Sequence, residues 1–328
     1  MRFQDGVDAQ PDVLARSAKA VQDALPNLAS PDDGAVIALV GIGASEHVAR
    51  SAAPVWRDHE LRAFAVSASE LLGDTPALAD VYVGMSESGR SAETVAALKK
   101  VTARRVGVTN FAASPITEVV DELLLMESGP DSPVYTTGYT ATLQALGLLG
   151  EHWAGKDSDW SSLPELASEV LAAAKPVIGS VLDHFDGARL IDVIGSGSSN
   201  ATAGEGALLL REAARAHTAA HETYNYLHGP MEPLDSESAC IVVGDEREIR
   251  LARDVSALGC HTLLVTSRSD VISTKKLTVV RLPEAPSALG QTVLQILPIQ
   301  LLGWSLANRR GLRVDGFRYE QDDIKLSS

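Results

Sequence analysis

The chain has 328 residues, of which 45% are hydrophobic, 22% are charged and only 5% are aromatic. This length predicts about two domains, and the small aromatic content favours helices packed on parallel sheets over a β-sandwich. The formal net charge is −15, with no long run of Lys and Arg. A nucleic-acid partner is therefore not expected, because nucleic-acid binding requires a basic face.

The sequence also lacks the signals of membrane insertion, secretion and metal clusters. No apolar run reaches the roughly 18 residues of a membrane helix, and residues 1–11 carry no signal-peptide core. The two cysteines, Cys240 and Cys260, are too few for a metal cluster or a disulfide framework. We therefore expect a cytoplasmic protein that has no membrane partner and binds no metal ion.

Short apolar runs alternate with helical stretches along the whole chain, which is typical of βα units in parallel sheets. A helix is predicted near each end, over residues 11–25 and 293–309. Strands are predicted over residues 36–40, 63–66, 81–84, 105–109 and 122–125, and again over 190–194, 239–244, 261–266 and 277–282.

An internal repeat divides these elements into two halves. Residues 41–45 and residues 195–199 both have the pattern Gly-x-Gly-x-Ser, and each follows an apolar strand and precedes a helix. Duplication is the simplest explanation. We expect two tandem, flavodoxin-like, doubly wound parallel-sheet domains, each a three-layer α/β/α sandwich. The predicted parts are a helical lead-in (1–30), a first domain (31–155), a second domain (165–310) and a C-terminal tail (311–328).

A serine-rich loop in the first half predicts an anion site. Residues 86–91, Ser-Glu-Ser-Gly-Arg-Ser, lie between an apolar strand and a helix. The first amides of a helix have no intrahelical partner and face the positive end of its dipole, so they bind anions such as phosphate. Dinucleotide binding is not favoured, because the turn at Gly41 and Gly43 lacks the third glycine of that fingerprint.

The corresponding loop of the second half is acidic. Residues 243–248 include Asp245, Glu246 and Glu248, whose carboxylates would repel a phosphate. We therefore predict one phosphate site per chain, in the first half.

These motifs together resemble the SIS (sugar isomerase) domain family, and within it the isomerase half of the glucosamine-6-phosphate synthases. The resemblance rests on the first glycine turn, the serine loop, and Glu205-Gly206-Ala207-Leu208 followed by Glu212. Residues 10–11, 134–137 and 228–230 resemble further family elements. No glutaminase domain is expected, because no cysteine follows Met1.

The resemblance implies a role for particular residues. The family's phosphate cradle corresponds to Ser45, Ser86, Ser88 and Ser91, and Glu87 stands where the family often has a phosphate-binding Gln. Arg90 is a candidate to offset the charge of Glu87, and Thr136 corresponds to a residue that contacts the sugar.

The resemblance also implies the chemistry. Glu212 corresponds to the base that moves a proton between C1 and C2 of the sugar, a transfer that one carboxylate can perform. His228 corresponds to the group that opens the sugar ring, and the family takes this histidine from the partner subunit. A homodimer is therefore expected, with His228 donated across its interface and no cofactor required.

Two departures from the family leave alternatives open. Leu209 replaces a lysine that lies three residues before the catalytic glutamate, and the family's imine-forming lysine near the C-terminus has no clean match, with Lys325 the only candidate. The favoured interpretation is a sugar-phosphate isomerase acting on a phosphorylated amino or keto sugar. A deaminase or deglycase on the same scaffold is an alternative, and so is a non-catalytic sugar-phosphate sensor.

Overall fold

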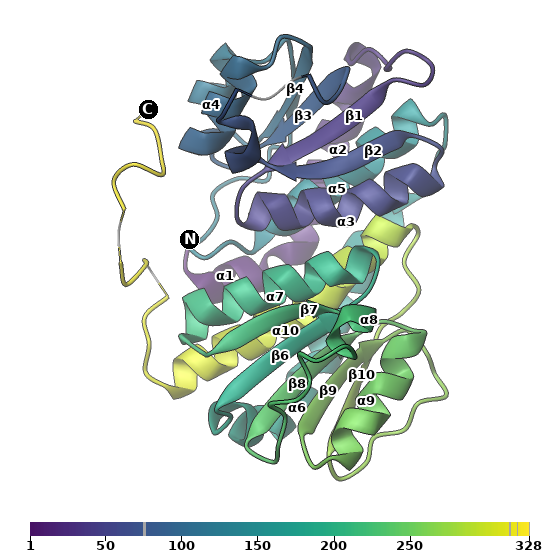
Figure 1. Ribbon diagram of the computed structural model, residues 1–328, viewed down its shortest axis with the longest axis vertical. Helices are drawn as coiled ribbons and strands as arrows, with labels where there is room; N and C mark the ends of the chain where they lie inside the picture. The colour runs from purple at the N-terminus through teal and green to yellow at the C-terminus, as the bar shows by residue number, and fades with distance from the viewer. Residues whose placement is uncertain (75–76, 315, 320, 328) are drawn as a thin grey trace.

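Ten strands form two parallel sheets in the computed structural model, which describes residues 1–74, 77–314, 316–319 and 321–327 (Figure 1). The first domain contributes β1 (Val36–Gly41), β2 (Arg62–Ser67), β3 (Val81–Met85), β4 (Arg104–Thr109) and β5 (Glu122–Leu125). The second contributes β6 (Leu190–Gly195), β7 (Thr218–Glu222), β8 (Ser238–Val243), β9 (His261–Thr266) and β10 (Leu277–Arg281).

The two sheets have the same topology. Their strand orders are β2-β1-β3-β4-β5 and β10-β9-β8-β6-β7, and every pairing is parallel. Counted from the first strand of each domain, both follow the order 2-1-3-4-5 of flavodoxin-like folds. The prediction of two tandem flavodoxin-like α/β domains is therefore confirmed.

Helices flank both sheets. Two of them precede the first sheet, α1 (Phe3–Asp8) and α2 (Gln10–Ala24). The first domain has α3 (Ala44–Asp58), α4 (Ala92–Lys100) and α5 (Thr137–Trp153). The second has α6 (Leu163–Asp186), α7 (Ser198–Ala214), α8 (Thr223–Tyr226), α9 (Arg247–Ala257) and α10 (Ala288–Arg309).

Apolar patterning accounts for most of these boundaries. The central strands β3 and β8 are buried along their whole length, so their sequences are continuous apolar runs. The edge strand β7 has the sequence Thr-Ala-Ala-His-Glu and is mostly half-buried, and the sequence analysis missed it for that reason. The predicted N-terminal helix is α2, and α1 is a further short helix ahead of it.

The two domains share one hydrophobic core. A single cluster of buried side chains extends from the first sheet to the second. Helix α3 packs against α5 and α7, α10 packs against α6 and α7, and α2 packs against α5 and α6. The lead-in helix α2 therefore contacts helices that belong to both domains. Because the interface is built from packed helices, the glycine turn before α3 has a defined position relative to α7.

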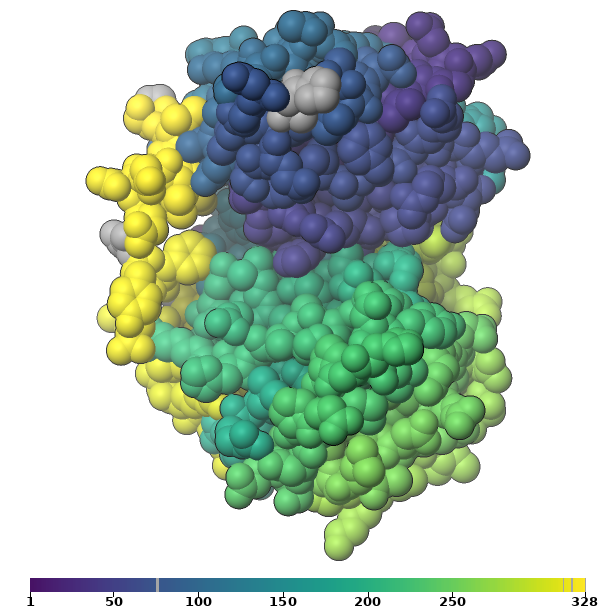
Figure 2. All heavy atoms as spheres, viewed as in Figure 1, coloured from purple at the N-terminus to yellow at the C-terminus, as the bar shows by residue number. Residues whose placement is uncertain are grey.

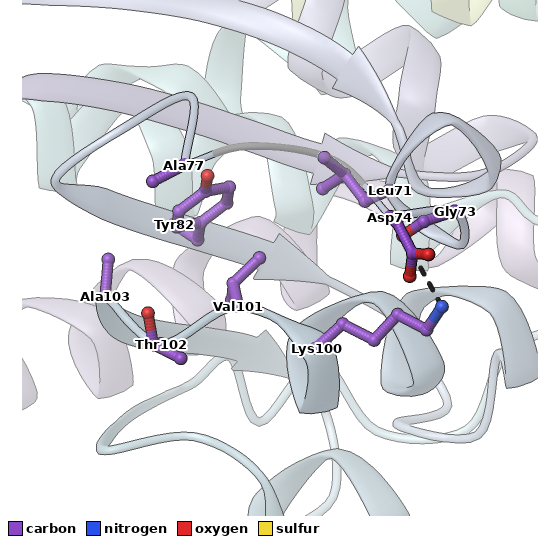
Figure 3. Close-up of a pocket in the computed structure, with 9 residues that line it drawn as sticks. All are labelled: Leu71, Gly73, Asp74, Ala77, Tyr82, Lys100, Val101, Thr102 and Ala103. Atoms are coloured by element: carbon purple, nitrogen blue, oxygen red, sulfur yellow. Dashed lines mark hydrogen bonds between the residues drawn. The ribbon is translucent and has the colours of Figure 1, made fainter.

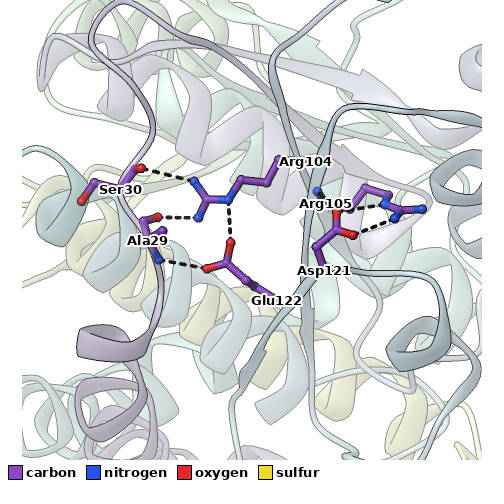
Figure 4. Close-up of polar contacts among 6 residues, drawn as sticks. All are labelled: Ala29, Ser30, Arg104, Arg105, Asp121 and Glu122. Atoms are coloured by element: carbon purple, nitrogen blue, oxygen red, sulfur yellow. Dashed lines mark hydrogen bonds and ion pairs between the residues drawn. The ribbon is translucent and has the colours of Figure 1, made fainter.

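Ion pairs fasten the amino ends of β4 and β5 (Figure 4). Arg104 Nε donates to Glu122 Oε1 at 2.6 Å, and its guanidinium also donates to the backbone carbonyls of Ala29 and Ser30. The next pair along the strands joins Arg105 Nη2 to Asp121 Oδ1 at 2.7 Å. The contacts of Arg104 hold the segment after α2 against the amino ends of the strands, which lie opposite their carboxyl ends.

The C-terminal tail leaves α10 at the second domain and ascends one side of the molecule to the first domain (Figures 1 and 2). Its end pairs with the serine loop. The amide of Ala92 donates to the carbonyl of Ile324 at 3.2 Å, and the amide of Leu326 donates to the carbonyl of Arg90 at 2.9 Å. The tail therefore spans both domains.

Within the ranges that the structure describes, no helix has the length and apolar character needed to cross a membrane.

Gly41 is required where β1 enters its turn, because a Cβ atom there would lie 2.6 Å from the backbone carbon of Ser45. We expect Gly41→Ala to lower the free energy of unfolding by about 1–3 kcal/mol, since backbone must move to accommodate the methyl group. Gly179→Ala is the matched control: Gly179 lies inside α6 with open space around it, so its replacement should be neutral or stabilising by up to about 1 kcal/mol. Urea unfolding measures both, and equal stability of the two variants would contradict the prediction.

Candidate active site

A cavity of about 250 Å³ lies between the two domains, beyond the carboxyl ends of β1 and β3. The first domain, helix α7 and the tail all contribute side chains to its wall. The lining residues are Ile42, Gly43, Ala44, Ser45, Glu87, Ser91, Glu93, Pro133, Tyr135, Glu205, Leu208, Glu212, Phe317, Ile324 and Lys325.

Two helix N-termini converge on this cavity. Ser45 lies in the first turn of α3, and Ser91 is the N-cap residue of α4. Gly43 precedes α3 with φ = +58°, a conformation that glycine adopts readily. Amide groups and positive dipole ends of two helices, together with two hydroxyl groups, make this part of the wall suited to an anion.

The other two serines predicted to bind the phosphate, Ser86 and Ser88, make hydrogen bonds within the loop. Ser86 is buried, and its Oγ accepts from the amide of Ser91 at 3.2 Å and lies 3.0 Å from Ser91 Oγ. Ser88 Oγ accepts from the amide of Arg90 at 3.3 Å. Neither serine is among the residues that line the cavity. Ser86 and Ser88 thus hold the backbone of the loop, while Ser45 and Ser91 face the space.

Glu87 is a buried carboxyl group in the same loop. Its side chain lines the cavity, and Oε1 accepts from Asn110 Nδ2 at 3.1 Å. Burial, with a smaller contribution from Asp131, raises the pKa of Glu87 to about 7. In its neutral form a glutamic acid can donate a hydrogen bond as a glutamine does. Glu87 is therefore compatible with a nearby phosphate when it is protonated.

Arg90 does not offset the charge of Glu87. Its Nε donates to the carbonyl of Leu326 at 2.6 Å, so the guanidinium group fastens the tail. Among the influences on the pKa of Glu87, the cation that lowers it is Lys325.

Helix α7 contributes two carboxyl groups. Glu205 and Glu212 are seven residues apart, and both line the cavity, because seven residues are close to two full turns of a helix. Burial raises the pKa of Glu212 to about 7, and Lys325 acts in the opposite direction. Glu205 is only 3% exposed, and burial raises its pKa well above the ordinary value.

The tail places Lys325 at the cavity. Its Nζ donates to Tyr135 OH at 3.2 Å and lies 5.4 Å from the centre of the Tyr135 ring. Lys325 also pairs with Ser91 as an isolated antiparallel bridge. The sequence did not match this lysine clearly to the imine-forming lysine of the family, because the tail has no helix or strand whose pattern would fix its position.

Thr136 and His228 lie outside the lining of the cavity. Thr136 is fully buried, and its hydroxyl and amide groups donate to the carboxylate of Asp131 at 2.6 and 2.8 Å. Its neighbour Tyr135 faces the cavity instead. His228 is exposed in the segment after α8. The sugar contact of Thr136 and the ring-opening role of His228 therefore stay predictions.

Sequence reasoning missed three residues around this site. Tyr135 was overlooked in favour of its neighbour, and the supporting Asn110 and Asp131 carried no motif. Asn110 directly follows the carboxyl end of β4, which is a position where ligand-binding residues gather in such sheets. Asp131 caps α5 by accepting from the amide of Gly138 at 2.7 Å, a contact that only the folded loop reveals.

A larger hollow of about 600 Å³ lies beside the amino ends of β3 and β4 (Figure 3). Two of its polar side chains, those of Lys100 and Tyr82, already have hydrogen-bond partners. Lys100 Nζ donates to the carbonyls of Leu72 and Gly73, and Tyr82 OH accepts from the amides of Leu78 and Ala79. We therefore assign the candidate active site to the smaller cavity, where helix N-termini and carboxyl groups face free space.

Fold and site together define a doubly wound α/β protein with a cavity between two similar domains, lined by helix N-termini and carboxyl groups. Residues 184–308 match the model of the family described as "SIS domain". The match covers most of the second domain, and for that domain it confirms the resemblance inferred from the motifs.

Known proteins of several activities resemble the chain. Glutamine–fructose-6-phosphate aminotransferase (isomerizing) from Thermus thermophilus is 28% identical over 256 residues, which cover 71% of this chain and 42% of that protein. The chain thus aligns with less than half of this curated relative. Glucosamine-6-phosphate deaminase from Thermotoga maritima superimposes with a TM-score of 0.80 at 20% identity, covering 99% of both chains. Tagatose-6-phosphate ketose/aldose isomerase from Escherichia coli has a TM-score of 0.78 at 18% identity, covering 95% of this chain and 94% of that one.

The raised pKa of Glu87 predicts how the stability of the protein depends on pH. Because the folded state holds this proton up to about pH 7 while an ordinary carboxyl group loses it near 4.5, Glu87 destabilises the fold as the pH rises through this range. We expect Glu87→Gln to stabilise the protein by about 1–3 kcal/mol more at pH 8 than at pH 5. Urea unfolding at both pH values measures this difference. The control Glu169→Gln, on the exposed side of α6, should not show it, and a pH-independent effect of Glu87→Gln would contradict the assignment.

Proposed function

We propose that this protein is a sugar-phosphate isomerase, which moves a proton between C1 and C2 of a phosphorylated amino or keto sugar. The observation that carries the proposal is one cavity lined both by the N-termini of α3 and α4 and by carboxyl groups of α7. An enzyme for this reaction must hold the phosphate and place a base beside the carbonyl end of the sugar. The cavity offers both.

The phosphate would bind at the N-termini of α3 and α4. Ser45 and Ser91 line this part of the cavity, and the backbone amides there can donate to phosphate oxygens. Glu87 would be protonated beside the bound phosphate, since two negative groups in a poorly solvated site disfavour one another. Binding of phosphosugar should therefore weaken as the pH rises above about 7, the pKa of Glu87.

Glu212 would be the base for the C1/C2 transfer. Burial brings its pKa to about 7, and a group with a pKa near the working pH both accepts and returns a proton efficiently. The sugar ring must open first, and His228 is the group that we infer for this step. Since His228 lies outside the cavity of its own chain, the proposal includes a homodimer in which each subunit supplies this histidine to its partner.

A deaminase or deglycase is the second candidate, and the charge of the cavity favours it. Four glutamates line the space, Glu87, Glu93, Glu205 and Glu212, against one lysine, Lys325. When these groups are ionised, such an excess of carboxylates suits a substrate that carries an ammonium group. The amine of Lys325 is also positioned to attack a keto sugar, as the imine-forming lysine of the SIS family does. A non-catalytic sensor draws its support from Leu209, which replaces the family's lysine in α7.

Removing one hydroxyl group from the proposed anion site should weaken ligand binding. We expect saturating 6-phosphosugar to raise the melting temperature of the protein, since a ligand at a hundredfold excess over its Kd stabilises by roughly 2.7 kcal/mol. Ser45→Ala and Ser91→Ala should lose most of this shift. Ser198→Ala, in the equivalent turn of the second domain, should keep it. A thermal-shift screen of 6-phosphosugars, their unphosphorylated parents and inorganic phosphate measures these effects, and equal stabilisation by the parents would overturn the phosphate site.

Glu212→Gln should stop the proton transfer while the ligand still binds. We expect the wild-type protein to exchange deuterium from D2O into the C1 or C2 position of its substrate, and the variant to do so about 10²–10⁴-fold more slowly. Proton NMR follows the exchange, and thermal shift verifies binding. Release of ammonia or amine in the same incubations would identify the second candidate. If the wild-type protein binds the ligand but shows neither exchange nor amine release, the result would favour the non-catalytic sensor.

A further inference from the structure

The carboxyl group of Glu205 is buried in the wall of the cavity without a partner. The residue is 3% exposed, and among the described residues its Oε2 has no hydrogen-bond partner. The side chain nevertheless lines the cavity. A buried polar atom that the protein leaves unpaired costs free energy, so a carboxyl group kept at this position in the wall of the cavity points to a functional role.

The surroundings of Glu205 raise its pKa and disfavour ionisation of this carboxyl group. The next turn of α7 provides the fully buried, apolar Leu209 and no cation. The ionisable groups that influence Glu205 most are Glu212 and Asp131, both acids that disfavour a further negative charge. The buried Tyr139 of α5 lies near Glu205, and His47 of α3 packs against the adjacent Gly204. Across the cavity lie Glu87 and Lys325.

A neutral carboxyl group and an ionisable one therefore share the same face of α7. Glu205 holds a proton that it can donate, and Glu212, with a pKa of about 7, can accept one. Two carboxyl groups whose environments separate their proton affinities are a common arrangement for paired acid and base roles.

We propose that Glu205 is a second catalytic residue, which carries a proton between O1 and O2 of the open-chain sugar while Glu212 carries one between C1 and C2. This inference rests on the proposed isomerase function. It explains why the chain can dispense with a lysine at position 209, since the carboxylic acid itself supplies the proton that the carbonyl oxygen needs.

The steps balance in the direction from aldose to ketose. Glu212 removes the proton from C2, the C2–H electron pair forms a C1–C2 double bond, and O1 takes the proton of Glu205 to give the enediol. The Glu205 carboxylate then removes the O2 proton, the carbonyl forms at C2, and C1 takes the proton from Glu212. Both carboxyl groups return to their starting states, and no oxidant or reductant is involved.

Glu205→Gln tests this role because glutamine keeps the shape and a hydrogen-bond donor but cannot release a proton. The substrate is the 6-phosphosugar that the wild-type protein isomerises. We expect kcat to fall about 10²–10⁴-fold while the ligand still raises the melting temperature. Wild-type activity should decline at alkaline pH as Glu205 ionises, and the residual activity of the variant should lack this decline. Glu205→Asp, which keeps a transferable proton, should recover part of the activity.

Glu248→Gln is the matched control. Glu248 is also buried, at 2% exposure, but it accepts from Thr223 Oγ1 at 2.6 Å in the second domain, away from the cavity. Its replacement by glutamine should leave kcat and the pH profile unchanged.

The outcomes separate the two proposals. A wild-type protein that binds phosphosugars but exchanges no C1 or C2 proton would overturn the isomerase function and this inference with it. An active wild-type protein with a Glu205→Gln variant of equal kcat and equal pH profile would overturn the role of Glu205 alone. The variant could also bind amine-bearing phosphosugars more weakly and neutral ones as before. That result would identify Glu205 as an ionised amine-binding group and would also overturn its role in proton transfer. Circular dichroism establishes that each variant is folded, and if Glu205→Gln does not fold, Glu205→Asp carries the same comparison of pH profiles.

Discussion

The packing of α3 against α7 is the contact on which the candidate active site depends. Helix α3 begins at the glycine turn of the first domain, and α7 carries the two carboxyl groups of the second. Their approach is close: a Cβ atom at Gly204 would collide with the ring of His47, and Ser51 Oγ donates to the carbonyl of Ser198 at 3.0 Å. Since this packing is part of the shared core, the N-terminus of α3 and the carboxyl groups of α7 keep a defined separation.

Desolvation determines the electrostatics of the cavity. Glu87, Glu205 and Glu212 have raised pKa values, and burial is the largest cause for each of them. The extent of burial differs along the wall, so one fold provides carboxyl groups that titrate in different pH ranges. Lys325 opposes this effect for Glu87 and Glu212. The tail that carries it therefore influences the acid–base balance on both sides of the cavity.

The two halves of the chain have similar backbone geometry at their glycine turns, but their loops carry different side chains. Both Gly-x-Gly-x-Ser turns precede a helix with a glycine N-cap of nearly the same conformation, φ = +58° at Gly43 and +57° at Gly197. In the second domain, however, Asp245 accepts from the hydroxyl groups of Thr266 and Ser267. The acidic loop thus pairs with its own neighbours, whereas the serine loop of the first domain borders a cavity.

Sequence patterns were enough to predict two flavodoxin-like domains and the serine loop, because apolar periodicity and glycine turns are local properties of the chain. The helix predicted to follow the serine loop is α4. Periodicity failed for β7, whose edge position permits polar residues. It also could not distinguish the cavity-facing Ser45 and Ser91 from the supporting Ser86 and Ser88, since all are serines near a helix start.

The folded structure was needed to show which distant groups share the cavity. Lys325 reaches it through backbone hydrogen bonds between the tail and the serine loop, and no local pattern encodes such a pairing. Thr136 turns towards Asp131 while Tyr135 faces the space, a choice made by the packing of the loop. The protonation of Glu205 likewise depends on burial among residues from α3, α5 and α7, and burial is a property of the whole fold and not of the helix that carries the residue.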